Sequence, residues 1–242
     1  LIPGVVVQSG NHAAIALAEA VAGSEEAFVQ VMNREAARLG MKGTRFMNAS
    51  GLPDPQHYST AQDLYALAEA LIRDFPPEYE RYYAQKEFRY NNVSQPNRIR
   101  LLWLDPSVDG VKTGHTESAG YCLIASSRRS GRRLLSVLLG STSESARAQE
   151  SQKLLNWGFQ FFDSVKLFGA GDSVKALEVW KGATDAVQVG VQGELFVTVP
   201  RGEADKLVQA GHTECDFAIL IEQAARASGL KLASENMAVD DG

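Results

Sequence analysis

Apolar residues in the first third of the chain recur at the three- and four-residue spacing of helices that bury one face. This spacing, with capping residues before it and glycine or proline after it, predicts three helices. They are an alanine-rich helix over residues 13–22 that stops at Gly23, a helix opened by Ser24-Glu25-Glu26 that ends at Gly40, and a helix opened by the capping box Ser59-Thr60-Ala61-Gln62 that ends at Pro76-Pro77. The apolar run Val5-Val6-Val7-Gln8 is strand-like, and the turn residues of segment 44–57 predict a loop.

The middle of the chain changes to the pattern of strands. Residues 87–90 and Val93, separated by Asn91-Asn92, predict a hairpin. Three longer runs predict an antiparallel sheet: residues 108–116, 120–127 and 132–140, the last two joined by a turn at Ser130-Gly131. A long amphipathic helix over residues 143–162 can cover one face of that sheet, so the predicted fold class is α+β.

Beyond residue 163 the composition shifts to short segments broken by glycine. They predict strands at residues 173–177, 178–180, 186–189 and 194–199. We therefore expect two domains, 1–163 and a small all-β domain over 164–242. Within the second, a divergent tail from about residue 207 includes a helix over 217–227, and the polar acidic residues 234–242 are expected to be disordered.

Composition excludes several classes of function. The chain has 242 residues, 45% of them hydrophobic, and a formal net charge of −5 with both signs interleaved, which makes nucleic acid an unsuitable partner. No run approaches the roughly 20 apolar residues of a membrane span, and no secretory leader opens the chain. Cys122 and Cys215 are expected to be separate thiols, and the four histidines lack metal-ligand spacing, so we expect no metal and no cofactor.

Candidate chemistry starts with the predicted strand that contains Lys112-Thr113-Gly114-His115. Side chains alternate along a strand, so Lys112 and Gly114 share one face while Thr113 and His115 share the other. Gly114 has no Cβ, and an extended peptide that ends in a carboxylate can approach such a strand edge closely. The alternative is that this short pattern is only a turn beside a strand.

A second pattern, Ser9-Gly10-Asn11, comes where a strand-like run turns into a helix. Gly10 permits a tight bend there, and the two polar side chains can then face a cleft. The alternative is that Ser9 or Asn11 merely caps the helix that follows. The order Ser-x-Asn, then about a hundred residues later Lys-Thr-Gly on the first of three strands, is that of active-site serine penicillin-recognising enzymes.

Longer runs extend this resemblance over residues 1 to about 206. They are Val7 to Asn11; Thr44-Arg45-Phe46-Met47-Asn48 with Gly51-Leu52; Tyr58 to Asp63; Asn97-Arg98 with Leu101-Leu102-Trp103; Val108 to Thr116 with Ala119-Gly120-Tyr121; Leu154 to Phe159; and Val197 to Gly202. The chain resembles the low-molecular-mass penicillin-binding proteins of peptidase S11 type, the D-alanyl-D-alanine carboxypeptidases. The resemblance implies a penicillin-binding, serine β-lactamase-like transpeptidase domain, with helices beside an antiparallel sheet, followed by a small β-rich domain.

The resemblance also implies roles for individual residues. Enzymes of this family attack the D-Ala-D-Ala amide with a serine activated by a lysine one helical turn later, and they form an acyl-enzyme. Ser9 would relay a proton to the leaving amine, Asn11 would hydrogen-bond the substrate's amide carbonyl, and Lys112 would bias Ser9 toward its reactive protonation state.

The residues expected to bind substrate lie on and beside the same strand. Thr113 and Arg98 would hold the terminal carboxylate, for which a planar guanidinium is well suited. Gly114 would admit the ligand backbone, and the backbone N–H of His115 would form half of an oxyanion hole. The His115 imidazole has no role that the residues or the resemblance supply.

The chain departs from the family pattern because the nucleophile is missing. The family's Ser-x-x-Lys lies upstream of Ser-x-Asn, and this chain starts eight residues before Ser9, so we expect an amino-terminally truncated fragment. Ser228-Gly229-Leu230-Lys231 fits the bare pattern, but Gly229 follows a predicted helix where the motif must open one. A lesser departure is Ile99-Arg100, where the family commonly has a second asparagine after Arg98, and the expected amphipathic membrane-binding helix does not appear by the end of the chain.

The first functional reading is a serine-type D-Ala-D-Ala carboxypeptidase of peptidoglycan maturation, in the periplasm or cell envelope of a bacterium. Its partners would be pentapeptides ending in D-Ala-D-Ala and β-lactams, with membrane association only through a segment absent from this chain. The alternative is a non-catalytic module that binds a muropeptide or a partner protein at the Lys112 strand edge. A β-lactamase would need a deacylating glutamate near residues 53–57, where only Asp54 is present.

Overall fold

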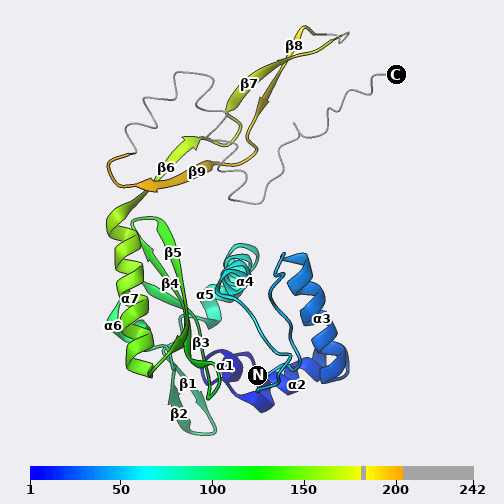
Figure 1. Cartoon of the computed structure of the whole chain (residues 1–242), viewed down its shortest axis with the longest axis vertical. Coiled ribbons are helices and arrows are strands. Elements are labelled where there is room, and N and C mark those ends of the chain that lie inside the picture. The colour runs from blue at the N-terminus through cyan, green and yellow to red at the C-terminus, as the bar shows by residue number, and fades with distance from the viewer. Residues whose placement is uncertain (181–183, 204–242) are drawn as a thin grey trace. The chain divides into compact units, whose positions relative to one another are not determined.

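A computed structural model describes residues 1–180 and 184–203 (Figure 1). The chain divides into two compact units, Leu1–Phe159 and Gln160–Gly242. The helix expected over 217–227, the tail over 234–242 and Cys215 lie outside the described residues. Described helices and antiparallel sheets together give the α+β class that the sequence predicts.

The described helices lie mainly before and after the strands of the first unit. They are α1 (Ile2–Val6), α2 (Asn11–Ala22), α3 (Glu25–Arg38), α4 (Ala61–Asp74), α5 (Pro76–Tyr82), α6 (Leu101–Leu104) and α7 (Glu144–Phe161). The predicted caps of α2 and α3 are confirmed. Gly23 ends α2 in a left-handed conformation with φ +84°, and Ser24 Oγ accepts a hydrogen bond from the Ala27 amide at 3.1 Å, beside two acids in the first turn of α3.

Two local predictions in the helical part were wrong. The run from Val5 to Gln8 is not a strand, because α1 occupies Ile2–Val6, with a proline in its first turn and Val6 and Val7 buried; a short apolar run has no period that separates helix from strand. The cap of α4 is Thr60, one residue later than the box expected from Ser59, and it accepts from the Asp63 amide at 3.1 Å. The predicted end of this helix at Pro76-Pro77 is confirmed, since α4 ends at Asp74, and Pro76 also begins α5, where a proline costs no hydrogen bond.

The strands of the first unit match the sequence prediction closely. A hairpin joins β1 (Glu87–Tyr90) to β2 (Val93–Pro96), and an antiparallel sheet has the order β3 (Val108–Thr116), β4 (Gly120–Arg129), β5 (Arg132–Ser141). Both two-residue turns have positive φ, at Asn91 and Asn92 (48° and 60°) and at Ser130 and Gly131 (48° and 80°), as the tight hairpin turns require. Among the described strands, β3 pairs with β4 alone and so forms one edge of the sheet.

Helices lie on both faces of this sheet (Figure 1). The main apolar cluster joins α6, β3, β4 and α7: Ile99, Leu101, Leu102, Val108, Leu123, Ala125, Ala148 and Leu155. Gly158 lets α7 lie close to β5, since a Cβ there would come within 2.7 Å of Leu134 Cδ1. On the other face, α4 contacts β4 and β5. The sheet that carries β3 is therefore a rigid base for any site at its edge.

The second unit, where described, consists of two antiparallel pairs. β6 (Phe162–Phe168) pairs with β9 (Leu195–Pro200), and β7 (Ser173–Glu178) pairs with β8 (Ala186–Gly190). The separate strand expected at 178–180 is wrong, because Glu178 is the last residue of β7. No helix in the parts of the chain that are described is long and apolar enough to span a membrane.

Candidate active site

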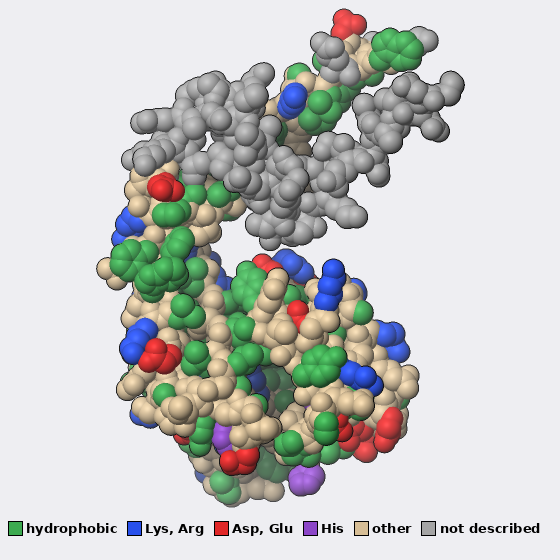
Figure 2. Space-filling model, in the orientation of Figure 1, with side chains coloured by type: hydrophobic (Ala, Val, Ile, Leu, Met, Phe, Trp, Pro, Cys, Tyr) green, Lys and Arg blue, Asp and Glu red, His purple; other side chains and the backbone are tan. Residues whose placement is uncertain are grey.

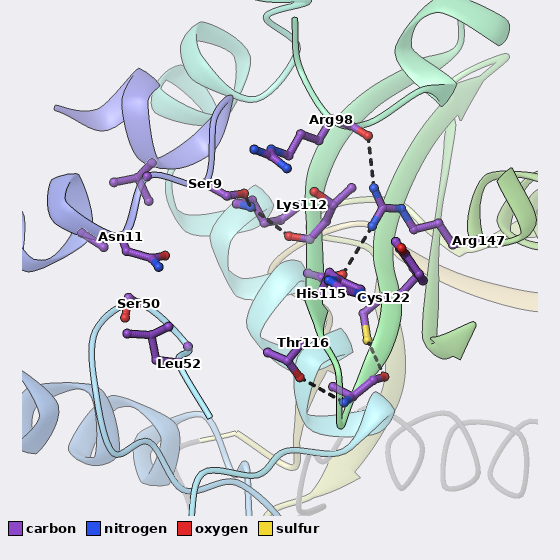
Figure 3. A pocket seen from close by; sticks show the side chains of 18 of the residues that line it. Ser9, Asn11, Ser50, Leu52, Arg98, Lys112, His115, Thr116, Cys122 and Arg147 are labelled. Atoms are coloured by element: carbon purple, nitrogen blue, oxygen red, sulfur yellow. Dashed lines mark hydrogen bonds between the residues drawn. The ribbon is translucent and has the colours of Figure 1, made fainter. Parts of the chain in front are cut away.

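A pocket of about 750 Å³ lies in the first unit, and its walls come from segments far apart in the sequence (Figure 3). One wall is the junction of α1 and α2, another is the loop that contains Ser50 and Leu52, and a third is the outer end of β3. On the face of the first unit seen in Figure 2, basic and acidic side chains are scattered among each other. Inside the pocket the balance differs, because three cations line it and Glu144 is the one acidic residue among its described lining residues.

Ser9 lies in the tight turn between α1 and α2. Its φ is +57°, and the turn is held by hydrogen bonds from the Ser9 amide to the Val5 carbonyl and from the Gly10 amide to the Gly4 carbonyl, both 3.0 Å. Gly10 is the N-cap of α2, and no side chain caps that helix. The alternative that Ser9 or Asn11 is only a capping residue is therefore wrong. Both line the pocket, with Asn11 exposed on the first turn of α2.

Lys112 reaches across the pocket from β3 to the Ser9 turn (Figure 3). Its Nζ donates a short hydrogen bond to Ser9 Oγ and another to the Thr113 carbonyl oxygen at 2.8 Å. Burial, together with the positive charges of Arg98 and Arg147, lowers the pKa of the Lys112 ammonium to about 8. A lysine with such a pKa can exchange a proton with the hydroxyl it contacts near neutral pH.

The segment Lys112-Thr113-Gly114-His115 lies inside β3, so the alternative that it forms a turn is wrong. Thr113 is 8% exposed, and His115 packs its ring against Tyr121 of β4 with centroids 4.1 Å apart. A Cβ at Gly114 would touch only the Cys122 Cβ, at 3.7 Å, so packing does not require glycine there. What the glycine provides is an uncovered strand edge beside the pocket, where a ligand backbone can approach.

Arg98 lies on the connector between β2 and α6, beside the Ser9 turn. Its Nε donates to the Gln8 carbonyl oxygen at 3.2 Å, and its side chain lines the pocket. The connector is fixed by Asn97, whose Oδ1 accepts from the Ile99 amide at 2.9 Å. Ile99, which departs from the expected family pattern, is fully buried in the core and does not line the pocket.

The loop opposite β3 forms another wall of the pocket. The sequence predicted it to be a turn-rich loop and included part of it in the family resemblance, but assigned it no role at the site. The Asn48 side chain bonds three times to the loop backbone, to the amides of Gly51 and Leu52 at 2.7 and 3.0 Å and to the Leu52 carbonyl at 2.9 Å. Glu25 of α3 accepts from the Ala49 amide at 2.9 Å. These bonds hold Ser50 and Leu52 at the pocket, and Ser50 Oγ donates a further, long hydrogen bond to Asn48 Oδ1 at 3.4 Å.

Sequence reasoning also missed Arg147 on α7. It is 3% exposed, lines the pocket, and belongs to a buried stripe at four-residue spacing with Ser151, Leu155 and Phe159. A charged residue on an otherwise buried helix stripe was the signal that could have identified it. Tyr121 and Cys122 also line the pocket, and the β3–β4 register, which pairs them with His115 and Gly114, could have placed them there.

The assembled pocket is suited to an extended ligand that ends in an anion. Arg98, Lys112 and Arg147 supply positive charge, β3 supplies an open strand edge, and the Ser9–Lys112 pair can carry a proton. Within residues 1–180 and 184–203, no group of three or more His, Cys, Asp and Glu side chains could hold a metal ion.

Comparisons with known proteins bear on both units. A family model described as D-alanyl-D-alanine carboxypeptidase matches residues 1–143, and one described as penicillin-binding protein 5, C-terminal domain, matches residues 162–211. The D-alanyl-D-alanine carboxypeptidase DacA of Escherichia coli strain K12 is 43% identical over 208 residues, which are 86% of this chain and 51% of that protein. The chain thus spans about half the length of the curated relatives it matches.

Solved structures agree with these matches. Penicillin binding protein 5 from Haemophilus influenzae is similar with a TM-score of 0.80 and 42% identity, over 84% of this chain and 59% of that one. Penicillin-binding protein D2 from Listeria monocytogenes in its cefotaxime-bound form is similar with a TM-score of 0.60 and 32% identity, over 65% of this chain and 64% of that one. The helices and the three-stranded sheet therefore have the fold of penicillin-binding proteins.

Proposed function

The chain belongs to the D-alanyl-D-alanine carboxypeptidase family, and from that premise we propose that it forms most of the cleft of a serine-type D-Ala-D-Ala carboxypeptidase of peptidoglycan maturation. The observation that carries the proposal is the meeting of Ser9, Lys112 and Arg98 at one open strand edge, from three segments of the chain. A cleft that offers cations and an unpaired strand edge suits a peptide ending in a free carboxylate.

Each residue has a proposed role in the reaction. The terminal carboxylate binds Arg98 and Thr113, and the peptide backbone lies along β3 beside Gly114. Asn11 hydrogen-bonds the substrate's amide carbonyl, and the backbone N–H of His115 stabilises the oxyanion. When the amide bond breaks, Ser9 passes a proton to the departing D-alanine amine, and Lys112 replaces it through the hydrogen bond that the two already share.

The attacking serine is the one part of this reaction for which the described cleft has no candidate. The two serines that line it, Ser9 and Ser50, are not followed by a lysine three residues later. Ser228 is followed by a lysine three residues later, but it lies outside the described residues. We therefore propose that a Ser-x-x-Lys segment from outside this sequence supplies the nucleophile, and that these 242 residues alone do not turn over substrate.

The same reading extends to partners, domains and location. Residues 1–163 form a partial catalytic domain and residues 164–242 a partial β-rich domain. The substrate is a peptidoglycan pentapeptide, and β-lactams acylate the same nucleophile; the cefotaxime-bound Listeria relative supports that expectation. The protein acts in the periplasm or cell envelope.

The test is to complete the cleft. The chain is fused behind the amino-terminal segment of the DacA relative, and the fusion and the 242-residue chain are each incubated with a fluorescent penicillin and with a peptide ending in D-Ala-D-Ala. Only the fusion should be labelled and release D-alanine. Release by the unfused chain would show that the nucleophile is misassigned, and a folded fusion that is neither labelled nor active would contradict the proposed function. Tight calorimetric binding of the peptide to the unfused chain, without acylation, would support a muropeptide-binding module instead.

A further inference from the structure

Arg147 is a buried cation whose contacts the proposed mechanism does not use. Its side chain is 4% exposed, and its acidic neighbour Glu144, 3.3 Å away, is 56% exposed and so largely hydrated. Burial accordingly lowers the pKa of the Arg147 guanidinium. A buried guanidinium is costly unless its N–H groups find acceptors, so what Arg147 donates to indicates what it does.

Two of those acceptors belong to the two segments that hold the proposed carboxylate site (Figure 3). Nη2 donates to the Arg98 carbonyl oxygen at 3.5 Å, and Nη1 donates to the Gly114 carbonyl oxygen at 3.4 Å. Arg98 lies on the connector before α6 and Gly114 lies in β3, so these two long hydrogen bonds join segments that are separate in the sequence. The guanidinium also lies over the ring of Tyr121, 5.5 Å from its centroid.

We propose that Arg147 is a positioning residue that ties the Arg98 connector to the end of β3, so that the Arg98 guanidinium and the open strand edge face one ligand carboxylate in a fixed geometry. This inference rests on the proposed function. The planar fork of arginine suits the task, because two N–H groups of one guanidinium reach two carbonyls at once. A lysine offers a single ammonium at one point and does not bridge them, although it keeps the charge.

A purely structural role predicts a different pattern of effects. If Arg147 only stabilises the fold, its loss acts equally on every ligand and independently of Arg98. If it positions Arg98, its loss acts on ligands with a free carboxylate and depends on Arg98 being present. A double-mutant cycle distinguishes the two, because residues that act as a unit give non-additive losses.

The experiment uses the fusion described above and two peptides, one ending in free D-alanine and one ending in its amide. Arg147→Met should raise KM for the free acid about tenfold with kcat changed by less than about twofold, the pattern for lost uniform binding of one hydrogen-bonded group. Arg147→Lys should lose nearly as much. On the amide, or in an Arg98→Ala background, Arg147→Met should cost less than about threefold.

Arg129 provides the matched control. It is a partly buried arginine of β4 that bonds to Asp105 at 2.6 Å and lies outside the pocket, so Arg129→Met should lower the melting temperature and leave KM for both peptides unchanged. Equal losses on acid and amide for Arg147→Met, additivity with Arg98→Ala, or full rescue by lysine would each overturn the positioning role.

A second measurement does not depend on turnover. Hydrogen–deuterium exchange of the fusion should speed up at residues 97–100 and 112–116 in Arg147→Met and not at the β1–β2 hairpin, because only the first two segments lose their tie. Unchanged exchange there would overturn the inference even if the enzyme is active. An inactive wild-type fusion with this exchange pattern would instead refute the proposed function and leave the tie supported.

Discussion

Burial of the Lys112 ammonium should make the stability of the protein depend on pH in a way that one substitution isolates. Desolvation within the pocket, with Arg98 and Arg147 nearby, lowers the pKa of Lys112 from 10.5 to about 8 in the folded chain. The unfolded chain keeps the ordinary value. Between these two pKa values the unfolded state therefore binds more protons than the folded state, and the free energy of unfolding must rise with pH.

The size of the effect follows from the two pKa values. Below about pH 8 both states are protonated, and the folded state carries the full cost of its buried charge, about 3 kcal/mol at pH 7. As the pH rises the folded Lys112 loses its proton first, so the cost falls to about 1.4 kcal/mol at pH 9.5. Wild type should thus gain about 2 kcal/mol over that range relative to Lys112→Met, which has nothing to titrate at this position.

Urea denaturation of both proteins at half-unit steps from about pH 7 to pH 9.5 measures this difference, and groups that titrate in both proteins cancel. Lys153→Met serves as a control for the loss of a lysine at the surface, since the Lys153 side chain is 71% exposed. A flat difference for Lys112→Met would refute the reasoning. It would mean that water or a counter-charge reaches the ammonium in solution.

Three further predictions concern the pocket and the residues that support it. In the completed enzyme, Arg98→Ala should lower kcat/KM by about 1.5–3 kcal/mol on a peptide ending in free D-alanine and far less on its amide; equal losses would show that Arg98 does not bind the carboxylate. Asn48→Ala removes three hydrogen bonds to the backbone of the loop opposite β3, so penicillin labelling should slow while the fold survives, and unchanged labelling would contradict a role for that wall. Tyr79→Phe removes the hydrogen bond to Asp109, but Arg133 still pairs with the Asp109 carboxylate. Urea denaturation should therefore show a loss of about 1 kcal/mol in the free energy of unfolding. A larger loss than for Asp109→Ala would contradict this expectation.

The sequence predicted best those elements whose signals are local. A two-residue turn such as Asn91-Asn92 fixes the pairing of its two strands, and the cap at Ser24 with its acids fixes the start of α3, because each depends only on neighbours in the chain. The α1 segment failed for the opposite reason. Its apolar residues are too few to show a period, and what they pack against is not visible in the sequence around them.

The sequence predicted the residues proposed to carry the chemistry of the candidate site, but only some of the residues that line it. Ser9, Lys112 and Arg98 came from motifs, and the structure brings all three to one pocket. Arg147 carries no motif, and its importance depends on bonds to residues 33 and 49 positions earlier in the chain. Pairings at such distances depend on how α7 packs against the sheet, and local patterns do not encode that.

The polar groups outside the pocket explain why those inside it stay available to a ligand. Asp109 accepts hydrogen bonds from Tyr79 and Arg133 near the start of β3, and the Asn48 side chain is hydrogen-bonded to the loop backbone. Because the scaffold residues hold one another in place, Thr113, Gly114 and the Arg98 guanidinium are not needed to hold the fold. These groups are already ordered when a ligand arrives and can bind it. Substitutions in the scaffold should therefore change stability and binding together, whereas those at Arg98 should change binding while stability barely moves. Measuring melting temperature beside KM for each variant separates the two groups.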